Sequence, residues 1–140
     1  QKIITVCDIL CASMAFQIFQ FGKERLMTSK AVLMAHPASG GSQGTLENMS
    51  AVIDMYKKFV DRLDAEVATR SGLEYNKFKA MVADNIWVET PEALALGLAD
   101  GVIFLDVNTK RENDIMFEMK SRGLYKPEMA NVKGYEFKLR

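Results

Sequence analysis

Thr5 to Gly44 reads TVCDILCASMAFQIFQFGKERLMTSKAVLMAHPASGGSQG and holds the only histidine of the chain. An apolar run from Ile3 to Leu10 leads into Ser13, and a second run from Ala31 to Ala35 leads into His36. Short apolar runs bounded by polar or turn residues predict buried strands. Ser13 and His36 therefore stand where strands end, which is where α/β folds gather their reactive and ligand-binding groups.

The composition is that of one soluble globular domain. The chain has 140 residues, and its 18 basic and 18 acidic residues cancel, so nothing in the charge points to nucleic acid or an anionic membrane. No apolar run reaches the ~18 residues that a membrane span needs. With one histidine and no second cysteine pair, no metal site is expected.

Cys7 and Cys11 lie four residues apart on the strand predicted to lead toward Ser13. This local spacing gives poor disulfide geometry. Their simplest interpretation is two small buried apolar residues. A nucleophilic role for Cys11 stays open as an alternative to Ser13.

Hydrophobic periodicity and turn residues predict the remaining elements. We expect, in chain order, a strand over Lys2–Cys7, a short buried helix over Met14–Phe21, strands over Arg25–Met27 and Ala31–Ala35, a long helix from a Thr45 N-cap to Gly72, a helix over Leu73–Ala83, a strand over Ile86–Val88, a helix with Thr90 as N-cap and Pro91 in its first turn, a strand over Val102–Leu105, a helix over Asn113–Arg122 and a half-exposed strand over Tyr135–Arg140.

The long helix carries an apolar stripe at spacings of three and four. Its members are Leu46, Met49, Ile53, Tyr56, Val60, Leu63 and Val67. The stripe is compatible with packing inside one subunit and with contact between subunits, and the pattern does not choose between them.

Several segments resemble the Clp protease proteolytic subunit family. Cys11–Ala15 resembles its nucleophile segment, Val32–Pro37 its histidine segment, and Trp87–Ala93 with Gly97–Asp100 its closing motif. The resemblance implies an α/β fold of the Clp/crotonase type, built from repeated ββα units. Residues 1–106 would be the C-terminal part of that domain, and residues 107–140 an extension that adds a helix and a strand. The signal peptide peptidase A family is a near relative.

The resemblance implies a serine endopeptidase that works through an acyl-enzyme without a cofactor. Ser13 would be the nucleophile, His36 the base, and the Met14 N–H an oxyanion donor. The orienting aspartate of the family falls on Asn85, with Asp84 one residue earlier. Three hypotheses stay open: Asp84 orients His36 after a one-residue shift, Asn85 orients it more weakly, or the site is a dyad or degenerate.

Gly40 and Gly41 resemble the family segment that pairs with extended substrate backbone. The family's second oxyanion donor comes from a segment that would precede Gln1, so we expect the chain to be part of a longer protein. The resemblance further implies a peptide or protein substrate, a homo-oligomeric ring, a separate ATPase partner and a cytoplasmic location.

Two rival functions remain. The first is a catalytically weak Clp-fold subunit with an assembly role. The second is a Ser–Lys protease of the signal peptide peptidase type, but no lysine lies between residues 37 and 45. Lys30 precedes its strand, and Lys57 and Lys58 lie in the middle of the long helix, so the sequence favours Ser–His chemistry.

Overall fold

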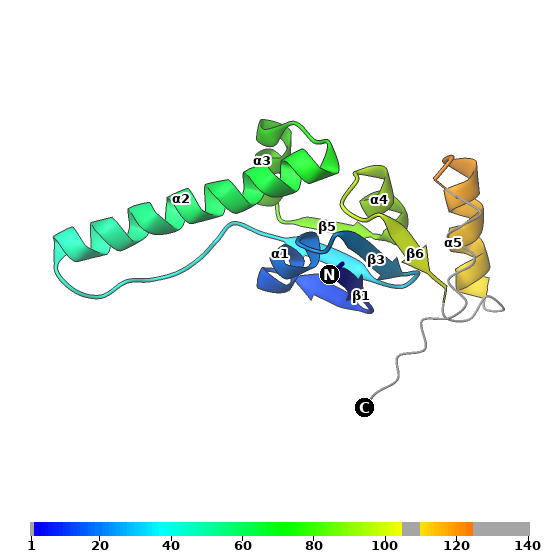
Figure 1. The fold of residues 1–140 in the computed structure, drawn as a ribbon, viewed down its shortest axis with the longest axis horizontal. Helices are drawn as coiled ribbons and strands as arrows, with labels where there is room; N and C mark the ends of the chain where they lie inside the picture. The colour runs from blue at the N-terminus through cyan, green and yellow to red at the C-terminus, as the bar shows by residue number, and fades with distance from the viewer. Residues whose placement is uncertain (1, 105–109, 125–140) are drawn as a thin grey trace, which may run out of the picture.

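The computed structural model describes residues 2–104 and 110–124 (Figure 1). The strands are β1 (Ile4–Cys7), β2 (Leu10–Ala12), β3 (Glu24–Thr28), β4 (Val32–Ala35), β5 (Ile86–Glu89) and β6 (Gly101–Ile103). The helices are α1 (Met14–Gln20), α2 (Leu46–Ser71), α3 (Tyr75–Ala83), α4 (Thr90–Ala95) and α5 (Lys110–Ser121). The strand predicted over Tyr135–Arg140 lies outside the described residues.

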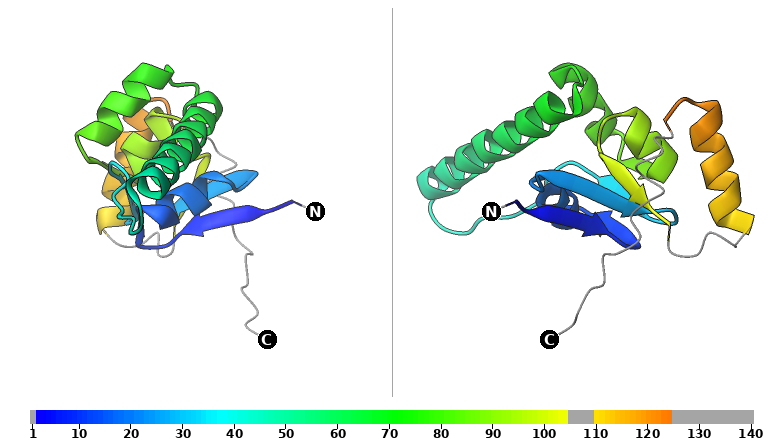
Figure 2. Two further views of the ribbon diagram at one scale, coloured as in Figure 1. Left: turned by 90° about the vertical axis from the view of Figure 1, so that its left-hand side faces the viewer. Right: turned by 45° about the vertical axis from the view of Figure 1, so that its right-hand side comes forward.

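The strands form two small sheets, which Figure 2 shows from two further sides. The first has the order β1-β3-β6 and is parallel. The second has the order β2-β4-β5, with β2 parallel and β5 antiparallel to β4. This mixed α/β arrangement agrees with the fold class expected from the sequence.

The sequence predicted a buried strand from the apolar run over Ile3–Leu10, but the run is not one strand. The chain bends at Asp8 and Ile9 and passes from the first sheet into the second. The Thr28 hydroxyl donates to the Asp8 carbonyl at this bend. Cys7 is buried, but Ile3 and Ile9 are each 65% exposed. The prediction failed because an apolar run shows neither where a chain changes sheets nor which face is covered.

The main core contains buried residues from both sheets and from helices α1 to α4. Leu33 of β4 is fully buried, and the rings of Phe16 and Phe78 stack with their centroids 6.5 Å apart. A buried polar network lies beside it. The Arg25 guanidinium, 3% exposed, donates to both Asp100 carboxylate oxygens, at 2.9 and 2.6 Å. The pair joins β3 to the loop before β6 and keeps a buried charge compensated.

Helix α2 begins and ends as predicted. The Thr45 side chain accepts from the Asn48 N–H, and Gly72 adopts a left-handed conformation at the C-terminus. The helix projects from the sheets, and residues 36–45 run outward to its far end (Figure 1). Its apolar stripe is buried only near the sheets, at Val67, while Tyr56 is 56% exposed. Within the described chain most of this stripe is therefore not core.

The Thr90 N-cap prediction is wrong. The N-cap is Glu89, and Thr90 is the first residue of α4. The Thr90 hydroxyl instead donates to the Thr28 carbonyl at 2.7 Å, so it ties α4 to the end of β3. Pro91 does lie in the first turn of α4. A cap residue next to a proline was a sound local signal, but a buried carbonyl offered the hydroxyl a tertiary partner.

Helix α5 packs against α4, beside β6. It begins at Lys110, three residues earlier than predicted, and its predicted end is confirmed by Gly123, which has a φ of 68°. Ile115 and Met119 of α5 form a small apolar cluster with Val102 of β6. None of the helices formed by residues 2–104 and 110–124 has the length and apolar content for a membrane span.

Candidate active site

Ser13 lies in the turn between β2 and α1 in a strained backbone conformation. Its φ is 56° and its ψ is −120°, outside the regions that residues with a side chain favour. The side chain is exposed, and the Ser13 N–H donates to the Met34 carbonyl at 3.0 Å, which fixes the turn against β4. A strained serine between a strand and a helix is how several hydrolases expose a nucleophilic hydroxyl.

His36 follows the last residue of β4. Because β2 and β4 are parallel neighbours with Ala12 opposite Met34, Ser13 and His36 leave the second sheet at the same edge. The His36 side chain is half-buried. Its Nδ1 lies 2.8 Å from the carbonyl oxygen of Pro37. The structure thus places both residues just beyond neighbouring strand ends, and within the described residues no hydrogen bond joins the Ser13 hydroxyl to the His36 ring.

Asp84 and Asn85 lie near the same edge, at the end of α3. Asp84 is the C-cap residue of α3, and Asn85 has a φ of 57°. In the antiparallel β4–β5 pair, Ile86 lies opposite Ala35, so Asn85 and His36 are the next residues at that end of the ladder. Both candidates are exposed, and within the described residues neither makes a hydrogen bond or ion pair with His36.

The remaining site candidates are accessible main-chain groups. Met14 is the first residue of α1, and its N–H has no acceptor in the part of the chain that the structure describes. Gly40 and Gly41 lie in the outward-running segment after His36, and no atom approaches within 4 Å of a Cβ built on either one. The Met14 N–H and the main chain of Gly40 and Gly41 are therefore unobstructed within the described residues.

The two cysteines differ in environment. Cys7 is buried, and its thiol lies 3.6 Å from the Val32 carbonyl oxygen. Burial, together with the neighbouring Cys11 thiol, raises the pKa of Cys7 to about 12. A thiol held neutral in this way is a poor nucleophile. Cys11 is half-buried on β2, two residues before Ser13.

The lysines considered for a Ser–Lys dyad do not lie at the edge that carries Ser13. Lys30 is in the turn before β4, at the end of that strand opposite to His36. Lys57 and Lys58 are exposed on the projecting part of α2. Groups of three or more possible metal ligands do not occur among residues 2–104 and 110–124.

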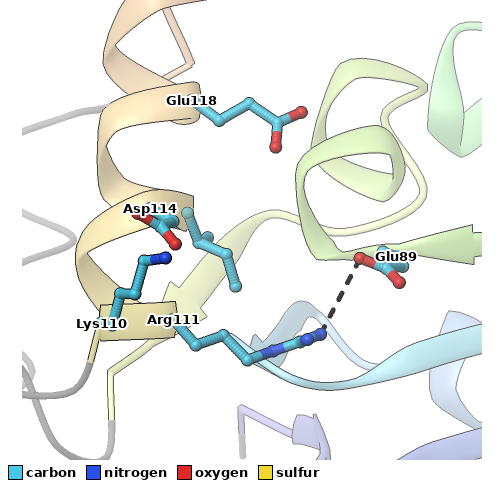
Figure 3. Close-up of a pocket in the computed structure, with 6 residues that line it drawn as sticks. Glu89, Lys110, Arg111, Asp114 and Glu118 are labelled. Atoms are coloured by element: carbon cyan, nitrogen blue, oxygen red, sulfur yellow. Dashed lines mark ion pairs between the residues drawn. The ribbon is translucent and has the colours of Figure 1, made fainter.

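An open pocket of about 430 Å³ lies at the far end of β5 from His36 (Figure 3). Glu89 and the first turns of α5 line it, and Arg111 reaches toward Glu89 at 3.9 Å. Lys110, Asp114 and Glu118 add charges of both signs. This mixture favours no particular ligand charge, so the pocket adds nothing to the chemistry of the Ser13 edge.

Sequence reasoning missed one group at this edge, the carbonyl of Pro37. Pro37 belongs to the segment that resembles the histidine motif, but that resemblance gave it no role. Every residue has a main-chain carbonyl oxygen, so residue type could not predict this partner. The contact between His36 Nδ1 and the Pro37 carbonyl is seen only in the structure.

Comparison with known families gives one match. The family model described as Clp protease matches residues 1–106, which include both sheets and helices α1 to α4. The matched region contains Ser13, His36, Asp84 and Asn85, and it ends before α5. The chain belongs to the Clp protease family.

Proposed function

We propose that this chain is a serine peptidase that hydrolyses peptide bonds through an acyl-enzyme. The observation that carries the proposal is the strained backbone of Ser13, held beside the strand that ends at His36. Strain of about 1–3 kcal/mol at one residue persists where function requires the geometry. Serine also needs a nearby base to be a useful nucleophile at neutral pH, and imidazole suits that task.

In the proposed reaction, the Ser13 hydroxyl oxygen attacks the scissile carbonyl carbon while His36 accepts its proton. The negative charge on the substrate oxygen would be stabilised by the Met14 N–H, and such a donor is typically worth about 3 kcal/mol in the transition state. The His36 proton then passes to the leaving amine. Water, activated by His36, hydrolyses the acyl-enzyme.

The proposed substrate is an extended peptide. Gly40 and Gly41 would pair with its main chain, because both are exposed and unobstructed. Asp84 or Asn85 would stabilise the protonated His36. We favour Asn85 because it directly precedes β5, whose first residue, Ile86, pairs with the residue before His36. No cofactor is needed for these steps.

Clp protease family members generally form oligomeric rings. We propose that the exposed apolar side chains of α2, with Leu46 80% and Ile53 47% exposed, contact a second copy of the chain. We also propose that a separate ATPase delivers protein substrates to this ring.

The test is labelling with a fluorophosphonate, which reacts with activated serines. We expect the chain to be labelled, Ser13→Ala to lose the label, and Ser39→Ala, another exposed serine near the edge, to keep it. Thermal melting should show that Ser13→Ala is folded. Label retained by Ser13→Ala would refute the assignment and direct attention to Cys11.

A second candidate function is assembly with a weak or inactive site. It is favoured by the lack of a hydrogen bond from His36 to Asp84 or Asn85, and by the exposed apolar stripe of α2. A chain that forms rings but is never labelled, even at long reaction times, would support this candidate over the peptidase.

A further inference from the structure

His36 has one polar partner within the described residues, the carbonyl oxygen of Pro37, 2.8 Å from Nδ1. A carbonyl oxygen can only accept a hydrogen bond, so Nδ1 must carry the proton for this contact to form. The proton-free Nε2 is then the nitrogen that can act as a base. We propose that the Pro37 carbonyl sets this tautomer of His36, a task that a side-chain carboxylate performs in a Ser-His-Asp triad.

This inference rests on the proposed function for its catalytic meaning. The tautomer itself can be measured whether or not the chain is a peptidase. Pro37 acts in it as a positioning residue, since its carbonyl contacts His36 and not the substrate.

The alternative partners do not occupy this place. Asp84 closes the last turn of α3, because its main-chain N–H donates to the Ala80 carbonyl at 3.2 Å. The Asp84 side chain is exposed. The Asn85 N–H donates to the Val82 carbonyl at 3.0 Å, and its side chain is exposed as well. Within the described residues, neither side chain bonds to the His36 ring.

Proline suits this role for a local reason. Its ring fixes φ near −65°, and it restricts the preceding residue, here His36, to extended conformations. The path from the His36 ring to the Pro37 carbonyl therefore has few soft dihedral angles. The contact depends on two adjacent residues and needs no long-range element to form.

A neutral carbonyl performs only part of the work of a carboxylate. It can fix the tautomer, but it stabilises the imidazolium of the transition state less than a full negative charge would. The inference therefore predicts a site whose base is correctly oriented and whose rate is limited by the missing charge.

The experiment uses the fact that His36 is the only histidine of the chain. In the ¹⁵N-labelled protein, two-bond ¹H–¹⁵N correlations at about pH 8.5, well above the ordinary histidine pKa of about 6.5, report the neutral tautomer without assignment. We expect the Nδ1–H tautomer to dominate in the wild type, in Asp84→Asn and in Asn85→Ala. A dominant Nε2–H tautomer in the wild type, or its appearance in either variant, would overturn the proposal.

A backbone substitution tests the carbonyl directly. Replacing Ala38 by its α-hydroxy analogue turns the Pro37–Ala38 amide into an ester, whose carbonyl is a weaker acceptor. The Ala38 N–H that is lost makes no hydrogen bond within the described residues. The Nδ1–H population should fall in this ester. It should stay unchanged in the matched ester at Ser39, which weakens the next carbonyl instead. An equal response of the two esters would refute the role of Pro37.

Fluorophosphonate labelling separates this inference from the proposed function. An Nδ1–H tautomer in a chain that is never labelled would leave the inference standing and remove the peptidase. A labelled Ser13 with an Nε2–H tautomer of His36 would support the peptidase and refute the role of the Pro37 carbonyl.

Discussion

Replacing Ser13 by glycine should make the protein more stable and inactive at the same time. Ser13 has a φ of 56° and a ψ of −120°, a combination that glycine adopts far more readily than a residue with a Cβ. The Ser13 hydroxyl makes no capping hydrogen bond to α1, so its removal leaves no buried donor or acceptor unpaired. The two effects of Ser13→Gly, relief of strain and loss of the hydroxyl, can therefore be separated.

The magnitude follows from two opposing contributions. Relief of the strained conformation should stabilise the fold by about 1–3 kcal/mol. The greater freedom of glycine in the unfolded chain should cost about 0.5–1 kcal/mol. The net expected gain in the free energy of unfolding is about 1 kcal/mol, which corresponds to a rise in Tm of roughly 4 °C for a chain of this size.

The assay is urea or thermal unfolding followed by circular dichroism, with fluorophosphonate labelling of the same samples. Two controls separate the effects. Ser13→Ala lacks the hydroxyl but keeps the strain, so it should lose the label with little change in stability. Ser39→Gly introduces glycine where φ is not positive, so it should bring no gain. A Ser13→Gly variant less stable than the wild type would refute the claim that the turn stores strain.

Three further predictions concern the site, the core and the projecting helix. Asn85→Asp should raise the rate of acylation severalfold, because a carboxylate at this exposed position next to the end of the β4–β5 ladder should stabilise the protonated His36 by up to about 1 kcal/mol; an unchanged single-turnover rate would contradict this. Burial raises the pKa of Asp100, but hydrogen bonds and charge from Arg25 outweigh this and hold that pKa below its ordinary 3.8. This stabilisation is present above that pH and is lost as the pH falls through the folded-state pKa. Asp100→Asn should therefore cost about 2 kcal/mol at pH 7, after allowance for the partial exposure of Asp100, and its stability deficit should shrink below about pH 3.8, as urea melts across pH would show. Tyr56→Glu, at an exposed position of α2, should lower the oligomer mass measured by light scattering while the variant stays folded, and an unchanged mass would contradict the proposed contact between copies.

The sequence alone determined the features that depend on neighbouring residues. The Thr45 cap, the left-handed Gly72 and the periodicity between them specified α2 almost to the residue, because capping and helical spacing act within a few positions. The apolar run over Ala31–Ala35 likewise placed His36 at a strand end, and the order of the motifs identified the family. These local signals met no competing tertiary partner, unlike the Thr90 cap signal, whose hydroxyl bonds to the Thr28 carbonyl. The strand that precedes Ser13 is instead the short β2, which the run over Ile3–Leu10 did not predict.

Only the tertiary structure decided which groups meet. The bend at Asp8 and Ile9, the bond from the Thr90 hydroxyl to Thr28, and the exposure of most of the α2 stripe all depend on partners that are distant in sequence or absent. The orientation of the His36 ring is a different case, because its partner, the Pro37 carbonyl, is adjacent in sequence but residue type does not show which rotamer the ring adopts. Periodicity shows which residues share a face of a helix or strand. Sheet pairing and side-chain packing then decide what that face touches.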